Sequence, residues 1–164
     1  MAQPVHNVLF LCTGNSARSI LGEAILNHLG RGRFQAFSAG SRPAGAVNPL
    51  TLEELRRMGL PTEGYRSKGW DELAIPGAPA MDFVFTVCDE AAKEPCPAWP
   101  GHPVTAHWGV PDPAAVSGTD AQRQEAFRSA ALTLWRRIEL FLSLPLEKLD
   151  HLARQAGAAD IGRR

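Results

Sequence analysis

The chain has 164 residues, of which 45% are hydrophobic and 21% charged, and its 17 basic and 17 acidic side chains leave no net charge at neutral pH. This length and composition predict one globular domain over residues 1–164, with a core large enough to fold alone. The balanced charge favours neither nucleic acid nor an anionic membrane as a partner. No apolar stretch approaches the length of a membrane span and the first residues lack a signal-peptide pattern, so we expect a cytoplasmic protein.

Short runs of β-branched and aromatic residues alternate with segments that have helical apolar spacing. The runs predict strands at 8–12, 34–38, 83–88 and 104–108. The helical spacing predicts helices at 19–29, 48–58 and 71–73. This alternation implies βαβ units and a parallel sheet, in which ligands bind outside the carboxyl ends of the strands. Cys12 and Cys88 each end a strand, so we expect them on the same rim.

A stripe of apolar residues with a period of about 3.6 follows Thr119-Asp120 and predicts a long helix packed on the sheet. The stripe consists of Phe127, Ala131, Leu134, Ile138 and Phe141. We interpret the adjoining Trp135-Arg136-Arg137 as a solvated flank. The core is expected over about residues 5–143, with a short C-terminal helix at about 146–156 and a frayed end over 157–164.

The first strand runs directly into Cys12-Thr-Gly-Asn-Ser-Ala-Arg18-Ser19, where turn residues lead into the first helix. The backbone N–H groups of such a loop, together with the helix dipole, bind a tetrahedral oxyanion. The same field favours a thiolate, so we expect a lowered pKa and a nucleophilic role for Cys12. Arg18 can donate two parallel hydrogen bonds to the oxyanion. The alternative is that Cys12 is only a small hydrophobic residue at a strand end.

Asp112 lies in Gly109-Val-Pro-Asp-Pro113, a loop made rigid by two prolines. Fixed geometry suits a carboxyl group that must meet a leaving oxygen as general acid. The same dipeptide is also an ordinary turn signal, so the residues alone leave both interpretations open.

Three cysteines, an odd number without a secretion signal, argue against a framework of structural disulfides. Cys88 could be buried at its strand end, whereas Cys96, between two prolines, has no apolar surroundings. Their spacing does not fit a zinc site, and the five histidines show no ligand spacing, so no metal is expected. Two such thiols could instead pass a disulfide from one to the other.

The chain resembles the low-molecular-weight protein tyrosine phosphatase superfamily, and its spelling is closest to the thiol-coupled arsenate reductases in it. The resemblance covers about residues 5–138. It is carried by Val8 to Ser19, Ser38-Ala-Gly40, Arg66-Ser-Lys68, Val87-Cys-Asp89, His107-Trp-Gly109 and Pro111-Asp-Pro113. It implies a flavodoxin-like α/β fold with a four-stranded parallel sheet flanked by helices.

The resemblance also assigns roles to residues. Cys12 would attack arsenate, Arg18 would bind it, and Asp112 would protonate the departing oxygen. Cys88 would then attack Cys12, and Cys96 would take over the disulfide, which an external thiol donor reduces. The residues of the substrate loop would be Thr13, Gly14, Asn15, Ser16, Ala17, Arg18 and Ser19.

No bound cofactor is expected, and the resemblance implies an external reductant, which is thioredoxin, glutaredoxin with glutathione, or another thiol. The family's other activity is hydrolysis of phosphotyrosine, for which the same Cys12, Arg18 and Asp112 would serve. Tyrosine phosphatases of the family usually place aromatic residues after the Asp-Pro pair, where this chain has Ala114-Ala115. A non-catalytic oxyanion sensor is a third reading. Family members also differ in a monovalent-cation site near Asn15 and Glu23, which we leave unassigned.

Overall fold

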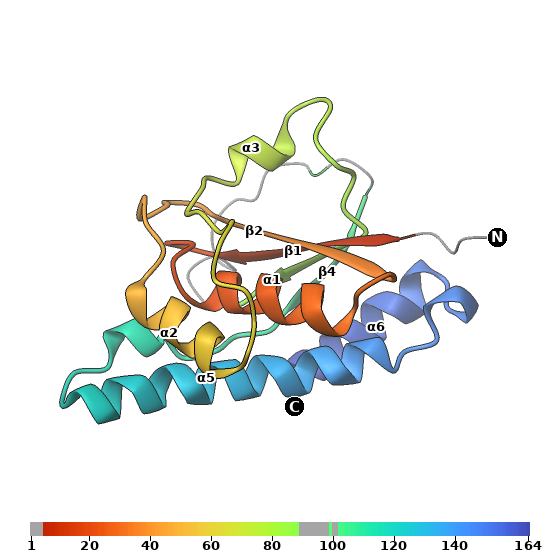
Figure 1. Ribbon diagram of the computed structural model, residues 1–164. Helices are drawn as coiled ribbons and strands as arrows, with labels where there is room; N and C mark the ends of the chain where they lie inside the picture. The colour runs from red at the N-terminus through yellow and green to blue at the C-terminus, as the bar shows by residue number, and fades with distance from the viewer. Residues whose placement is uncertain (1–4, 89–98, 100–101) are drawn as a thin grey trace.

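A computed structural model describes residues 5–88, 99 and 102–164 of the chain (Figure 1). Four strands form one parallel sheet, as the sequence predicts, and the strand order is β2-β1-β3-β4. The strands are β1 (His6–Cys12), β2 (Phe34–Gly40), β3 (Phe83–Thr86) and β4 (Val104–His107). The helices are α1 (Arg18–Leu29), α2 (Pro49–Arg57), α3 (Asp71–Ala74), α5 (Asp120–Leu142) and α6 (His151–Gly162), with short 3-10 turns at Pro113–Ala115 and Leu146–Lys148.

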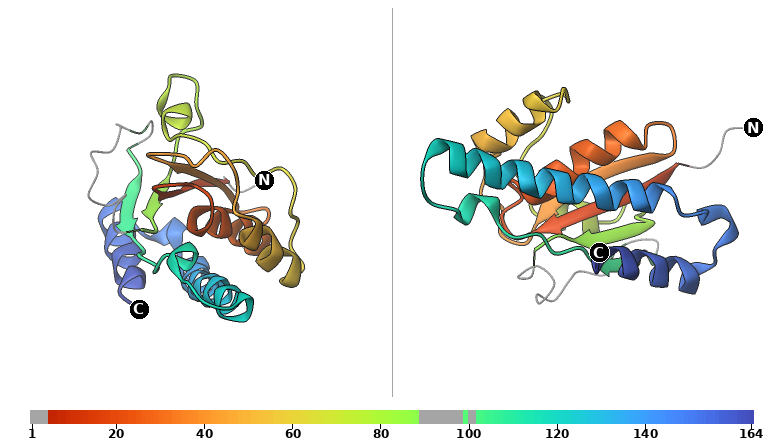
Figure 2. Two further views of the ribbon diagram at one scale, coloured as in Figure 1. Left: turned by 90° about the vertical axis from the view of Figure 1, so that its left-hand side faces the viewer. Right: turned by 90° about the horizontal axis from the view of Figure 1, so that it is seen from below.

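The sheet is covered on both faces, which explains why β1 is apolar from Val8 to Cys12 rather than alternating. Helices α1 and α5 pack on one face, and α3 lies over the other (Figures 1 and 2). Val8, Phe10 and Cys12 belong to the larger core on the α1 and α5 side, whereas Leu9 and Leu11 face the smaller core under α3. Cys12 therefore ends β1 with its side chain on the side of α1.

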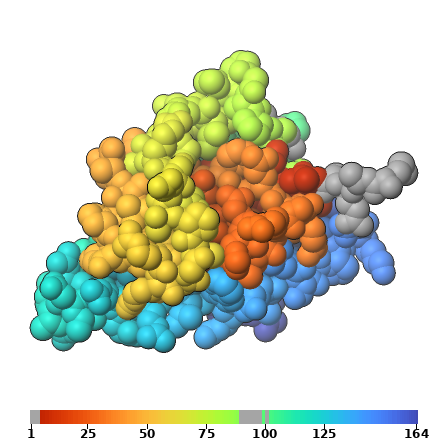
Figure 3. Space-filling model, viewed as in Figure 1, coloured from red at the N-terminus to blue at the C-terminus, as the bar shows by residue number. Residues whose placement is uncertain are grey.

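Register brings the carboxyl ends of the strands together. Cys12 pairs with Gly40 of β2, and Leu11 pairs with Thr86 of β3, which in turn pairs with His107 of β4. Helix α2 begins at an Asn48 cap, whose side chain accepts from the N–H of Leu50. The connection that follows α2 packs along α1, as the space-filling view in Figure 3 shows. The segments before and after α2 enclose the loop that follows β1.

The C-terminal helix differs from the sequence prediction. It begins at His151 and continues to Gly162, so the expected helix at 146–156 and the expected fraying of 157–164 are wrong. The reason is tertiary: Ala158 and Ile161 are buried, and the indole N–H of Trp108 donates to the Ala158 carbonyl at 3.0 Å. The end of α6 has few apolar residues, and its packing against Trp108 keeps it helical.

Helix α6 also closes the outer edge of the sheet. The Gln155 side chain accepts from the N–H of Thr105 at 3.1 Å and donates to the carbonyl of the same residue. Both edge groups of β4 are therefore bonded at this position, which protects an otherwise open strand edge.

The two glycines of α6 give a test of this packing. A Cβ on Gly162 would overlap the His107 carbonyl oxygen, whereas one on Gly157 would meet Leu144 at an ordinary 3.4 Å. Gly162→Ala should therefore lower the free energy of unfolding by about 1–3 kcal/mol. Gly157→Ala, the matched control, should raise it by about 0.5–1 kcal/mol through helix propensity. Urea unfolding of both variants measures this, and equal effects would contradict the tight contact.

Candidate active site

The loop between β1 and α1 depends on Asn15, which has a left-handed backbone with φ of 47°. Its fully buried side chain donates to Ser19 Oγ at 2.8 Å and accepts from the N–H of Lys68 at 2.8 Å. Gly40 must be a glycine here, because a Cβ would overlap the Thr13 carbonyl oxygen. The loop is thus fixed from the side of β2 as well as from within.

The loop's carbonyl groups are bonded from outside. Thr13 O accepts from the N–H of Arg42, and Gly14 O accepts from the N–H of Ala44 and from Ser67 Oγ, each at 2.9 Å. Ser16 O accepts from the N–H of Asn48 and the hydroxyl of Thr51. Within the described residues, no acceptor is bonded to the N–H of Gly14, Ser16 or Ala17. These donors suit an oxyanion.

Cys12 is 3% exposed, and its sulfur lies 2.8 Å from Ser19 Oγ and 3.2 Å from the N–H nitrogen of Asn15. Burial raises the pKa of the Cys12 thiol, although the bonds from Ser19 and Asn15 lower it in part. The lowered pKa predicted from the sequence is therefore wrong for this loop without a bound anion. The pattern of loop residues reveals the hydrogen-bond donors but not how completely the fold excludes water from the sulfur.

Cys88 follows β3 and lies beside the loop. Its sulfur is 3.4 Å from Thr13 Oγ1, the residue is 2% exposed, and its charge contributes to raising the pKa of Cys12. The structure thus brings together two of the three predicted relay thiols. Cys96 lies outside the described residues.

Arg18 and Asp112 meet across the site. The Arg18 guanidinium donates to the Val110 carbonyl at 3.0 Å and lies 3.7 Å from a carboxylate oxygen of Asp112. The other Asp112 oxygen accepts from the N–H of Ala114 at 2.9 Å and caps the 3-10 turn. The Asp112 side chain is 43% exposed, so solvent and a bound ligand can reach it.

A cavity of about 640 Å³ opens between these groups. Its lining consists of Arg18, Cys88, His107, Gly109, Val110, Pro111, Asp112 and Gly162. The sequence did not predict the contribution of Gly162, which depends on the unforeseen length of α6.

A polar pair links β2 to α1, and sequence reasoning missed it. Ser38 of β2 donates to the Glu23 carboxylate, and burial raises the pKa of Glu23 despite the favourable charge of Lys68. A serine facing inward from an apolar strand was the available signal. Within the described residues, no three His, Cys, Asp or Glu side chains gather as a metal site would require.

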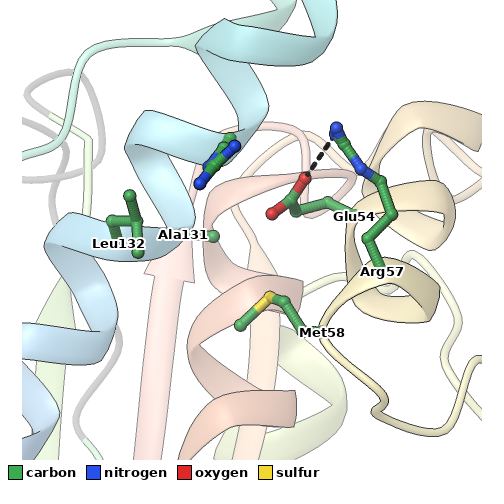
Figure 4. Close-up of a pocket in the computed structure, with 6 residues that line it drawn as sticks. Glu54, Arg57, Met58, Ala131 and Leu132 are labelled. Carbon is green, nitrogen blue, oxygen red and sulfur yellow. Dashed lines mark hydrogen bonds and ion pairs between the residues drawn. The ribbon is translucent and has the colours of Figure 1, made fainter.

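A second cavity of about 380 Å³ lies between α2 and α5, far from the cysteines in the sequence (Figure 4). There the buried Glu54 carboxylate points toward Arg57, at 3.5 Å, and Met58 and Leu132 form part of the wall. This cavity contains no nucleophile. The ion pair of Glu54 and Arg57 lies where α2 meets α5. We therefore place the candidate active site in the first cavity.

A family model described as low molecular weight phosphotyrosine protein phosphatase matches residues 7–152. The chain belongs to this family. The arsenate reductase of Shouchella clausii is 34% identical over 134 residues, which cover 82% of this chain and 93% of that protein. The arsenate reductase of Bacillus subtilis is 31% identical with the same coverage. The resemblance to the arsenate reductase members of the family is thus confirmed.

Solved structures of the family share the fold. A thioredoxin-dependent arsenate reductase from Corynebacterium glutamicum superimposes with a TM-score of 0.56 and 27% identity, over 85% of this chain and 65% of that one, so the chain spans slightly less than two thirds of it. An arsenate reductase in its oxidized state gives a TM-score of 0.67, and a low-molecular-weight tyrosine phosphatase from T. tengcongensis gives 0.62. At 24% and 23% identity, the last two show the fold alone.

The family match ends at residue 152, so most of α6 lies beyond it. No helix among the described residues has the length and apolar character that crossing a bilayer requires.

Ser19 provides a test of how this family member controls its thiol. Ser19→Ala removes the 2.8 Å contact to Cys12, so the pKa of the Cys12 thiol should rise further and its thiolate should form at higher pH. Thiolate absorbance against pH, measured with Cys88 and Cys96 both changed to Ser, would follow Cys12 alone. Ser67→Ala, a change at a loop hydroxyl that bonds Gly14 rather than the sulfur, is the matched control. An unchanged titration in Ser19→Ala would contradict the role of this hydroxyl.

Proposed function

We propose that this protein reduces arsenate to arsenite through a cysteine nucleophile and a thiol-disulfide relay. The observation that carries the proposal is the second thiol at the anion loop, with Cys88 Sγ 3.4 Å from Thr13 Oγ1. Hydrolysis of a phosphate ester needs one nucleophile, whereas reduction needs a second thiol to release the product. The relatives named as arsenate reductases support the same reading.

In the first step the Cys12 sulfur attacks arsenic, a sulfur–arsenic bond forms and an arsenic–oxygen bond breaks. The N–H groups of the loop and the Arg18 guanidinium hold the anion, for which Arg18 turns from Val110 toward the ligand. Asp112 gives its proton to the departing oxygen, which leaves as water. The proton of the Cys12 thiol passes to an anionic oxygen of arsenate as the sulfur attacks.

In the second step Cys88 attacks the Cys12 sulfur as a thiolate. A disulfide forms, the sulfur–arsenic bond breaks, and its electron pair remains on arsenic, which leaves as arsenite. Cys96 then attacks Cys88, which forms a Cys88–Cys96 disulfide and frees Cys12. An external dithiol takes up the disulfide, so the two electrons come from that donor and no bound cofactor is needed. A cellular donor of this kind is found in the cytoplasm, where we place the protein.

The donor is thioredoxin, or glutaredoxin with glutathione, and the decisive assay compares them. Purified protein is given arsenate and NADPH with each complete thiol system, and both NADPH oxidation and arsenite are measured. We expect turnover with one of the two. Arsenite from neither system, together with hydrolysis of an aryl phosphate, would favour the phosphatase reading. Against that reading, Ala114 and Ala115 form the 3-10 turn after Asp112 and offer no aromatic ring to a phenyl group.

Cys12→Ser should abolish arsenate reduction, because a hydroxyl of ordinary pKa is a poor nucleophile and cannot enter a disulfide. Phosphate should still bind, since the N–H groups and Arg18 remain, and isothermal titration can measure this. Arg18→Lys should also be inactive, because an ammonium cannot reproduce the planar pair of donors. Substantial reduction by Cys12→Ser would overturn the proposed function.

The relay can be resolved one thiol at a time. Cys88→Ser should stall with arsenic on Cys12, whereas Cys96→Ser should release about one equivalent of arsenite and accumulate a Cys12–Cys88 disulfide. Peptide mass mapping after a single turnover identifies the species in each variant. Steady turnover of Cys96→Ser would exclude the two-cysteine shuttle and leave a glutathione-resolved route through Cys88.

A further inference from the structure

Arg137 is a buried cation in the middle of the long helix α5. It is 8% exposed, whereas its neighbour Arg136 is exposed, so the prediction of a solvated flank is wrong for Arg137. The helical period explains the difference, because Arg137 lies on the buried side with Leu134, Ile138 and Phe141.

The Arg137 guanidinium is held by main-chain carbonyls. It donates to Gly109 O at 3.0 Å and to Arg164 O at 3.4 Å from two of its nitrogens. In the part of the chain that the structure describes, no Asp or Glu side chain pairs with it, and burial lowers its pKa. Burying a guanidinium is costly unless its donors are hydrogen-bonded, and these contacts offset that cost.

Gly109 begins the segment that ends in the Asp112-Pro113 pair. Its neighbour Val110 is bonded twice, by N–H to Val87 O and by its carbonyl to Arg18. Arg137 and Arg18 therefore hold the carbonyls of consecutive residues in the same segment. When Arg18 turns to an oxyanion, Val110 O loses its donor, and Arg137 is then the side chain that still anchors the segment to the helical layer.

The contact continues into the end of the chain beyond the family match. Arg164 O accepts from Arg137, Gly162 lies against the His107 carbonyl, and Trp108 donates to Ala158. The end of α6 thus contacts the two residues that precede this segment, His107 and Trp108, in a region that the family model does not cover.

We propose that Arg137 is a positioning residue, which joins the end of α6 to Gly109 and so holds Asp112 where it protonates the departing oxygen. This inference rests on the proposed function, since it concerns the general acid of that reaction. Arg137 touches neither substrate nor sulfur. Its effect on the rate is therefore expected to pass entirely through Asp112.

A double-mutant cycle separates positioning from general stability. Arg137→Met and Arg137→Lys are made in the full chain with and without Asp112→Asn, and Arg136→Met is the matched control on the same helix. Arsenate reduction is measured under the donor system that supports the parent, together with kcat and KM separately, the pH profile, phosphate affinity and melting temperature. Asp112→Asn alone should slow kcat by roughly two to four orders of magnitude.

Arg137→Met should lower kcat by roughly tenfold to a hundredfold, the effect of a misplaced catalytic group, while KM and phosphate affinity stay within about twofold. In the Asp112→Asn background it should change little, and Arg136→Met should match the parent. The kcat of Arg137→Lys should lie between those of Arg137→Met and the parent, because the lysine ammonium can replace only the contact to Gly109. If Arg137→Met does not fold, the cycle is completed with Arg137→Lys.

An equal slowing with and without Asp112 would overturn the inference, as would an unchanged kcat in Arg137→Met. Either result leaves the proposed function standing, because the parent still reduces arsenate. A parent that reduces no arsenate with either donor would instead overturn the proposed function itself, and this inference with it.

Discussion

The hydrogen bonds of the Asn15 side chain hold the loop between β1 and α1 in a backbone conformation that few residue types adopt. A left-handed backbone at this position turns the chain between Cys12 and α1, and the amide reaches both Ser19 and the main chain of Lys68. Ser19 in turn contacts the Cys12 sulfur. A buried amide with both ends satisfied is rigid, because every alternative leaves a polar group unpaired. The position of the nucleophile is therefore set by residues from three parts of the chain.

The same enclosure that orders the loop opposes ionisation of its thiol. A sulfur sealed from water is protected from unwanted oxidation, but its thiolate loses the stabilisation of solvent. Ser19 and the N–H of Asn15 replace part of that stabilisation. In the proposed reaction, a substrate anion would fill the ring of N–H donors and accept the proton of Cys12.

The segment from Gly109 to Pro113, which carries Asp112, is held by hydrogen bonds from several directions and not by its prolines alone. Val110 is bonded to Val87, Gly109 to Arg137, and Asp112 caps the turn that follows it. Helix α6 adds a contact that lies mostly beyond the family match, against β4 and Trp108. A shared family fold thus carries an extension on the side of the sheet where the cavity opens toward Cys88 and His107.

The resemblance to the family placed Asp112 at the site. The sequence by itself determined the parallel sheet, the loop after β1 and the grouping of Cys12, Arg18 and Cys88. These follow from local signals: apolar periodicity, turn residues and the end of a strand, which parallel topology gathers on one rim. Only the tertiary structure decided the direction of the Cys12 pKa, the partial burial of Glu23, the burial of Arg137 and the ordering of α6. Each of these depends on how much water distant segments exclude, or on which carbonyl lies opposite a donor. Neither quantity is encoded in the neighbouring residues along the chain.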